Sequence, residues 1–148
     1  REMASQRVRI QKLLPDAVLP TYGSASAAGA DLYACGEAVT IAPGETALVH
    51  TGIVMEIPQG LVGLVYARSG LATKRGLAPA NKVGVIDSDY RGEIMVALYN
   101  QGAVSQTVLP GERVAQLVLT PYVSANFVES ETLSDTVRGQ GGFGSTGK

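Results

Sequence analysis

Short apolar runs follow one another along the whole chain, and turns rich in glycine and proline separate them at nearly regular spacing. The prolines lie one or two residues from the ends of these runs, where a missing N–H group costs least. Such a pattern is typical of an all-β sandwich or barrel. It predicts strands at residues 8–14, 30–35, 38–41, 46–49, 53–57, 61–67, 82–86, 93–99, 104–109 and 114–119.

One segment alone, Ser69–Arg75, has a helical pattern, with Ser69 as a candidate N-cap and Gly76 as a candidate stop. Because strands and helices do not alternate, we do not expect a parallel, Rossmann-type sheet. No repeat or linker divides the chain, and its 148 residues suit one domain of ordinary size. We expect a β-barrel domain over residues 1–137 and a glycine-rich tail over 138–148.

Two of the predicted strands are apolar on both faces, at residues 94–98 and 117–119. A strand of this kind is covered on both sides. In a domain this small, the second cover is either a loop of the same chain or a neighbouring subunit. The sequence leaves both alternatives open.

Composition and charge exclude several classes of protein. Hydrophobic residues make up 45% of the chain and charged residues 17%, which is too apolar for a disordered segment. The formal net charge is −1, so we expect no broad basic face for nucleic acid. No apolar run approaches the ~20 residues that cross a bilayer, and no apolar region of a signal peptide follows Arg1 and Arg7. We expect an intracellular, cytoplasmic protein with no membrane partner.

The chain contains one cysteine and one histidine, Cys35 and His50. A single cysteine cannot form an internal disulfide framework. Neither residue has sequence neighbours that would complete a metal cluster or a nucleophilic triad. We therefore expect Cys35 and His50 to be packing or surface residues.

An anion-binding site is predicted at residues 67–72, where a predicted strand is followed directly by the short helix. The first N–H groups of the helix, at Ser69 and Gly70, point outward and can bind an anion, and Arg68 adds charge. The alternative is that Ser69 only caps the helix while Arg68 is solvated. Gln116 is a polar residue inside an apolar strand, and it needs either a structural partner or a ligand if it is buried.

Two acidic residues at strand ends are candidates for chemistry. Asp31 begins a strand, where an acid is either a turn residue or a ligand for Mg²⁺, directly or through water. Asp87 follows an apolar run and is either part of a plain hairpin turn or a carboxylate that deprotonates a water. Upstream, the amide of Asn81 both donates and accepts, so it can read the edge of a base.

The tail has the parts of a phosphate cradle, although it is not a Walker A sequence. Its five glycines between residues 139 and 147 let backbone N–H groups approach an anion, and Ser145 and Thr146 add hydroxyl donors. Arg138 can bind phosphate oxygens, and Phe143 offers a face to a base. The alternative is a flexible terminus without a ligand.

Five of these segments, in this order, resemble the five motifs of the trimeric dUTPase family: residues 28–34, 67–72, 84–93, 111–117 and 138–147. Each motif is weak alone, but together they cover nearly the whole chain. The resemblance implies a jelly-roll-like or distorted β-barrel (the dUTPase-like β-clip) with one short helix. It also implies a homotrimer. One subunit would supply the first, second and fourth motifs of an active site, a second subunit the third motif, and the flexible tail of the third subunit would close over the nucleotide.

The resemblance further implies hydrolysis of dUTP to dUMP and pyrophosphate with Mg²⁺, which limits uracil in DNA and supplies dUMP. Asp87 would activate the attacking water, and Asp31 would hold water ligands of the Mg²⁺. The base and sugar would be bound by Asn81, Gly84, Val85, Ile86, Tyr90 and Phe143. The phosphates would be bound by Arg68, Ser69, Gly70, Gln116, Arg138, Gly142, Ser145 and Thr146.

Two other functions compete with this interpretation. A dCTP deaminase of the same superfamily, alone or bifunctional, would carry a glutamate base in its pocket, whereas the third motif presents Asp87 and Tyr90. A trimer that only senses dUTP would be indicated by loss of Asp87 or of the tail, and the sequence retains both.

Overall fold

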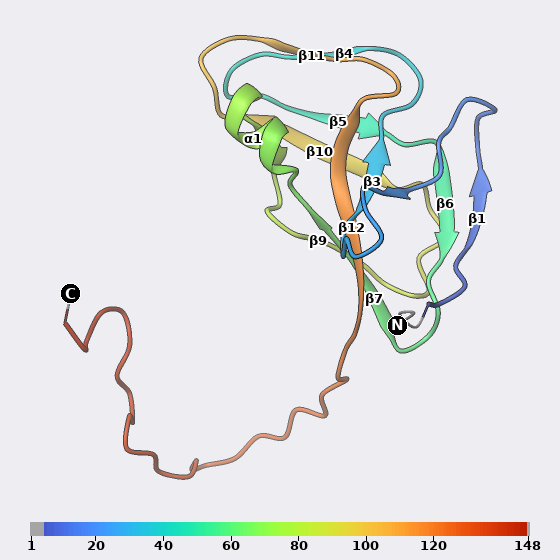
Figure 1. The fold of residues 1–148 in the computed structure, drawn as a ribbon. Coiled ribbons are helices and arrows are strands. Elements are labelled where there is room, and N and C mark those ends of the chain that lie inside the picture. The colour runs from blue at the N-terminus through green and yellow to red at the C-terminus, as the bar shows by residue number, and fades with distance from the viewer. Residues whose placement is uncertain (1–4, 148) are drawn as a thin grey trace.

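A computed structural model describes residues 5–147 and shows a domain built from short strands (Figure 1). The single helix of this part is α1 (Ser69–Arg75). The strands are β1 (Arg9–Lys12), β2 (Thr21–Tyr22), β3 (Ala30–Tyr33), β4 (Val39–Ile41), β5 (Thr46–His50), β6 (Ile53–Glu56), β7 (Leu61–Tyr66), β8 (Leu77–Pro79), β9 (Gly84–Ile86), β10 (Met95–Asn100), β11 (Gln106–Val108) and β12 (Arg113–Pro121). The predicted all-β class with one short helix is confirmed.

The strands are arranged in four small antiparallel sheets. The largest has five strands in the order β2-β3-β12-β7-β9, and a second has the order β5-β10-β8. Two ribbons, β1-β6 and β11-β4, complete the set. The long strand β12 pairs with β3 on one side and β7 on the other, so it lies inside the largest sheet. The inward side chains of these sheets form one core that includes Leu32, Ile53, Leu77 and Leu98.

The strand β10 leaves one apolar face incompletely covered. Val96 and Leu98 point into the core and are almost fully buried. On the opposite face, Met95 is 40% exposed, and Leu48 on the neighbouring strand β5 is 56% exposed. A loop of the same chain, residues 81–93, covers part of this face and forms a pocket there.

The helix ends as predicted but begins differently. Gly76 has φ of 68° and donates its N–H to the carbonyl of Ala72, which confirms it as the stop. The N-cap position is held by Arg68 in an extended conformation, with no capping bond from a side chain. The prediction that Ser69 caps the helix is therefore wrong, because Ser69 is already its first helical residue. The sequence pattern also missed β2 and β8, which are too short to show an alternation.

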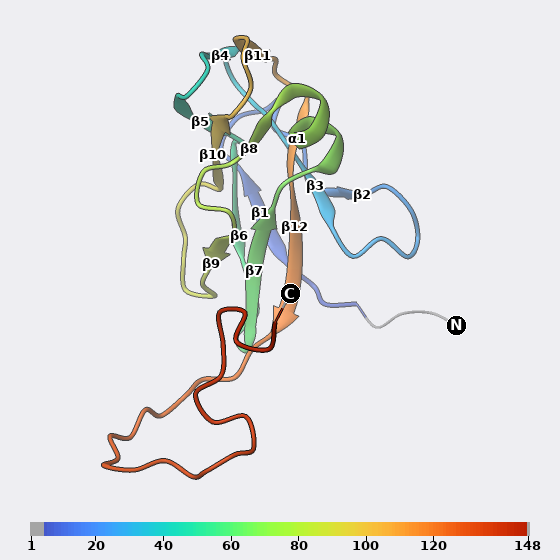
Figure 2. The ribbon, with the colours of Figure 1, turned by 90° about the vertical axis from the view of Figure 1, so that its left-hand side faces the viewer.

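After β12 the chain leaves the barrel and runs outward, as both views show (Figure 1, Figure 2). No strand or helix is present between residues 122 and 147. Several large apolar side chains of this stretch are exposed, among them Val123, Phe127, Leu133 and Phe143. Regular structure thus ends at Pro121, and the predicted boundary at residue 137 stays a prediction. Among the described residues, no helix has the length and apolar character that a membrane crossing requires.

Candidate active site

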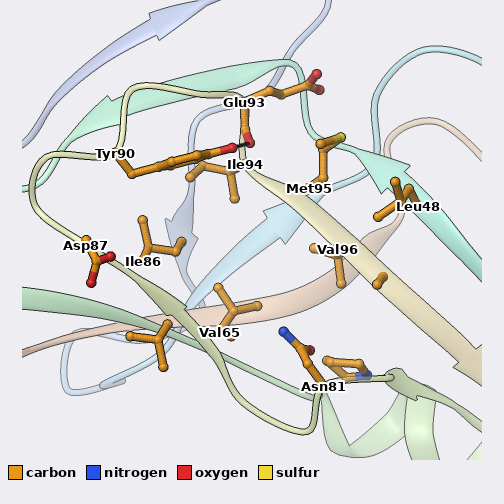
Figure 3. Close-up of a pocket in the computed structure, with 14 residues that line it drawn as sticks. Leu48, Val65, Asn81, Ile86, Asp87, Tyr90, Glu93, Ile94, Met95 and Val96 are labelled. Atoms are coloured by element: carbon orange, nitrogen blue, oxygen red, sulfur yellow. Dashed lines mark hydrogen bonds between the residues drawn. The ribbon is translucent and has the colours of Figure 1, made fainter.

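A pocket of about 320 Å³ opens between strand β10 and the loop formed by residues 81–93 (Figure 3). Its floor is apolar and includes Val65, Ile94 and Val96. Its polar residues come from the loop, and the sequence analysis had singled out most of them. The loop residues that line the pocket, polar and apolar together, are Asn81, Gly84, Val85, Ile86, Asp87, Tyr90 and Glu93.

The first half of the loop is held in place by main-chain contacts. The N–H of Ala80 donates to the carbonyl of Ala97 on β10 at 2.8 Å. The strand β9 pairs with β7, and Gly84 lies opposite Val65. A Cβ at Gly84 would lie 3.2 Å from the Cβ of Val65, so glycine allows the two strands to approach closely. Figure 3 shows the amide of Asn81 directed into the pocket.

Asp87 follows immediately after β9, so its carboxylate is carried by the end of a paired strand, as predicted. Its main-chain carbonyl accepts a hydrogen bond from the N–H of Tyr90 at 3.1 Å, which closes a tight turn. Figure 3 shows Asp87 and Asn81 on opposite sides of the pocket. The pocket therefore offers one ionisable acid and one amide across an apolar floor.

The ring of Tyr90 lies over the pocket, and its hydroxyl donates to the main-chain carbonyl of Glu93 at 2.8 Å (Figure 3). The ring passes so close to Gly92 that a Cβ at this position would collide with it. A glycine is therefore required beside Tyr90. The ring is 41% exposed and free to contact a ligand.

A second group of polar residues lies where α1 begins; we call Asp31, Arg68, Arg113 and Gln116 the arginine cluster. The Nε of Arg68 donates to one carboxylate oxygen of Asp31 at 3.0 Å, and a guanidinium nitrogen of Arg113 lies 3.5 Å from the other. The amide of Gln116 donates to the carbonyl of Ala67 at 2.8 Å. Ser69 and Gly70 follow directly in the first turn of α1.

Arg113 is the member of this cluster that sequence analysis missed. It lies in the fourth motif, but that motif was read for Gln116 alone. The register between β12 and β3 shifts between Arg113 and Ala115, and an irregularity of this kind cannot be seen in the residue pattern. The side chain of Asp31 is 14% exposed, so the carboxylate sits between two guanidinium groups largely out of solvent.

In one chain, the pocket and the arginine cluster lie on opposite faces of the five-stranded sheet. Val65 and Leu117 are paired across β7 and β12 and point into the core, where both are 6% exposed. The next pair, Tyr66 and Gln116, points the other way because side chains alternate along a strand. Asp31 pairs with Gln116 and shares its outward face. One chain therefore does not bring the two groups of predicted residues together.

The predicted residues of the tail are also apart from both groups. Phe143 is fully exposed, and Arg138 donates to the carbonyl of Gly141 within the tail itself at 2.6 Å. Gly142, Ser145 and Thr146 lie in the turns that follow.

No group of three histidine, cysteine, aspartate or glutamate residues within residues 5–147 could hold a metal ion. Both oxygens of Asp31 face arginines. Mg²⁺ keeps several waters and is commonly bound by one or two carboxylates together with phosphate oxygens. These residues fit a Mg²⁺ ion that arrives on a phosphate ligand and contacts Asp31 through water.

The two residues set aside in the sequence lie outside these groups. Cys35 is buried, and its thiol donates to Asp16 Oδ1 at 3.6 Å. Burial raises the pKa of the Cys35 thiol, and the neighbouring Asp16 charge raises it further. Cys35 is thus a packing residue, as predicted. His50 is at the surface and contacts Glu93.

Comparison with known proteins gives consistent matches. A family profile described as dUTPase matches residues 16–147. A deoxyuridine 5'-triphosphate nucleotidohydrolase of Acinetobacter baumannii is 50% identical over 132 residues, which is 88% of each chain. The protein of the same name from Wolinella succinogenes is 47% identical over 147 residues, covering 99% of this chain and 98% of that one.

Solved structures match as well. The dUTPase of Staphylococcus bacteriophage 80alpha, solved with dUPNHPP, superposes with a TM-score of 0.90 at 27% identity, over 97% of this chain and 100% of that chain. A mutant dUTPase from phage phi11 of S. aureus, described as coordinating a structural Mg(II) ion, has a TM-score of 0.78 at 24% identity. It covers 86% of this chain and 98% of its own.

Proposed function

The chain belongs to the dUTPase family and hydrolyses dUTP, and from this premise we propose that the pocket beneath the loop of residues 81–93 binds the deoxyuridine part of the substrate. One observation carries the proposal. Asn81, Gly84, Val85, Ile86, Asp87 and Tyr90, chosen from the sequence for base, sugar and water, all line one cavity. Its volume of about 320 Å³ lies at the lower end of the range for small-ligand pockets.

Base recognition is assigned to Asn81 together with backbone groups of β9. The amide of Asn81 can donate and accept at once, which suits the edge of uracil. Gly84 brings the backbone of β9 close to Val65 and Asn81, and we assign rejection of the thymine methyl to this side of the pocket. A site that pairs its polar groups with one base edge discriminates strongly against a base that leaves them unpaired.

We assign contact with the deoxyribose to Tyr90 and activation of the attacking water to Asp87. The ring of Tyr90 would pack under the deoxyribose and leave no space for a 2'-hydroxyl. The carboxylate of Asp87 would hold a water in line with the α-phosphorus and take its proton as the new P–O bond forms and pyrophosphate leaves. In this family of reactions the protein mainly positions the water and stabilises charge.

We assign the triphosphate to Arg68, Ser69, Gly70 and Gln116. Arginine can bind phosphate oxygens in a bidentate manner. When Mg²⁺ is bound, it would neutralise charge on the phosphates, with Asp31 holding its water ligands. A phosphate would compete with Asp31 for Arg68, so binding would rearrange the ion pair measured at 3.0 Å.

The opposite placement of the two groups in one chain supports a homotrimer in which each active site is shared. A second subunit would bring its arginine cluster to the pocket of the first. The tail of residues 138–148, through Arg138, Gly142, Phe143, Ser145 and Thr146, would close over the nucleotide. A mobile segment that orders on substrate excludes water while the chemistry occurs.

Glu93 bears on the deaminase alternative, because a glutamate base in the pocket would favour it. Its carboxylate points away from the other labelled pocket residues (Figure 3). It lies within hydrogen-bond distance of His50 and accepts the N–H of Gly52. It is therefore not directed at a bound base. This arrangement favours hydrolysis of the triphosphate over deamination.

The proposal is tested by incubating the protein with Mg²⁺ and each of dUTP, dCTP, dTTP and UTP, and measuring monophosphate and pyrophosphate. We expect rapid pyrophosphate release from dUTP alone. In Asp87→Asn we expect kcat to fall by about 10²–10⁴-fold, the usual contribution of a general base, with dUTP binding retained. If the variant also loses dUTP binding, Asp87 is a structural residue and the assignment is wrong.

A further inference from the structure

Glu93 connects the pocket to a neighbouring part of the barrel. Its main-chain carbonyl accepts the hydrogen bond from the Tyr90 hydroxyl at 2.8 Å. Its carboxylate oxygens lie 3.0 and 3.1 Å from Nδ1 of His50, and one of them accepts the N–H of Gly52 at 3.0 Å. The carboxylate side chain is 20% exposed, whereas that of His50 is 55% exposed. The backbone of Glu93 thus contacts Tyr90 at the pocket. Its side chain contacts His50 at the end of β5 and Gly52 in the connection between β5 and β6.

These contacts lie where the loop of residues 81–93 joins the core. The next residue, Ile94, is 2% exposed and donates its N–H to the carbonyl of Ile53 at 2.9 Å. Between β9 and Glu93, residues 87–92 make bonds within the segment itself, and the exposed Arg91 lies 3.4 Å from the carboxylate of Glu56. The exposed ion pair contributes little to holding the loop. The side-chain bonds of Glu93 and the burial of Ile94 therefore attach the loop to the core on the C-terminal side of Tyr90.

We propose that Glu93 and His50 form a clasp that positions Tyr90 and so sets the preference for deoxyribose over ribose. The inference rests on the proposed contact between Tyr90 and the sugar. To exclude the 2'-hydroxyl of a ribose, the Tyr90 ring must stay within a fraction of an ångström of its position. A ring that moves more freely would leave space for that hydroxyl. Glu93 touches no substrate in this account and acts through the carbonyl that receives the Tyr90 hydroxyl.

The inference is tested with kcat and KM for both dUTP and UTP. In Glu93→Ala we expect the ratio of kcat/KM values, dUTP over UTP, to fall about three- to tenfold, the factor that corresponds to one net hydrogen bond. In His50→Ala we expect a smaller fall in the same direction. In His50→Gln, whose amide can still donate to Glu93, we expect most of the ratio to be retained. The matched control is Glu37→Ala, which removes an exposed carboxylate from a turn of the barrel and should leave the ratio unchanged.

A double variant separates positioning from a general loss of structure. Tyr90→Phe removes the hydroxyl and keeps the ring, so it should lower the ratio as Glu93→Ala does. Because both changes break the same link, Glu93→Ala combined with Tyr90→Phe should lose little more than either alone. Thermal unfolding shows whether each variant is folded. If Glu93→Ala does not fold, the exposed His50 variants carry the test.

Two results overturn the inference in different ways. An unchanged ratio in a folded Glu93→Ala variant whose kcat falls equally for both substrates gives Glu93 a structural role only. Fully additive losses in the double variant would likewise separate Glu93 from Tyr90. An unchanged ratio in Tyr90→Ala instead refutes the contact between Tyr90 and the sugar, and with it the premise of the inference.

Discussion

Individual residues in this chain owe their properties to a few close neighbours. Asp31 lies between two guanidinium groups, so its negative charge is compensated without a metal. Cys35 is enclosed by apolar residues beside the carboxylate of Asp16, and both surroundings disfavour its thiolate. The same residue types would behave differently on an exposed turn. At this scale, environment rather than residue type determines reactivity.

The raised pKa of Cys35 gives a pH prediction. The folded state holds the thiol proton more tightly than the unfolded state, so this residue contributes its full share of stability below the ordinary thiol pKa. As the pH rises above that value, the unfolded chain loses the proton first, and the folded state is progressively destabilised. We expect the Tm to fall at alkaline pH with a slope that is smaller in Cys35→Ala. Identical slopes in the two proteins would contradict the prediction.

Single helices and strands show which structural features the residue pattern predicts and which it does not. The helix and its stop at Gly76 could be predicted, because a glycine after a helical segment has a definite conformational meaning. The N-cap could not, since Arg68 takes that position without any side-chain bond. The third motif indicated the pocket loop correctly because Asn81 and Asp87 are close in sequence. The partnership of Asp31 with Arg113 depends on strand pairing across a register shift, which sequence spacing does not encode.

Gly76 also gives a stability prediction for the helix. It has a positive φ of 68°, and a Cβ there would lie 2.9 Å from the backbone nitrogen of Gly102. We expect Gly76→Ala to lower the free energy of unfolding by about 1–3 kcal/mol, the usual cost of a strained backbone position. Gly70 lies inside the same helix with open space around it, so Gly70→Ala should stabilise the fold by about 0.5–1 kcal/mol. Urea unfolding of both variants measures the difference, and equal effects would contradict it.

Taken as a whole, the molecule leaves large apolar side chains exposed in two places. The outer face of β10 and the extended residues after Pro121 expose large apolar side chains such as Met95 and Phe127. Exposed apolar side chains in these two places support the proposed contact between subunits. The open question from the sequence, whether a loop or a subunit covers the second face of β10, is answered only in part by the loop of residues 81–93. A neighbouring subunit remains the proposed second cover.

The proposed lid is tested by removing residues 138–148. The barrel ends before this segment, so we expect the truncated protein to keep its fold and its oligomeric state. Hydrolysis of dUTP should fall at least about a hundredfold, because small misplacements of reacting groups have costs of that order. Light scattering and a pyrophosphate assay provide the two readouts. Wild-type activity in the truncated protein would contradict the lid, and loss of the oligomer would give the tail a structural role.

We propose that a complete active site combines the pocket of one chain with the arginine cluster of another. We would co-express Asp87→Asn with Arg68→Ala, each of which should be strongly impaired alone, and assay dUTP hydrolysis of the mixed assemblies. If sites are shared, random mixing gives about a quarter of the sites one intact pocket and one intact cluster from different chains, and activity returns to about that fraction of wild type. If both residues act within one chain, every site carries a defect. Activity no greater than that of the two separate variants would therefore contradict the account.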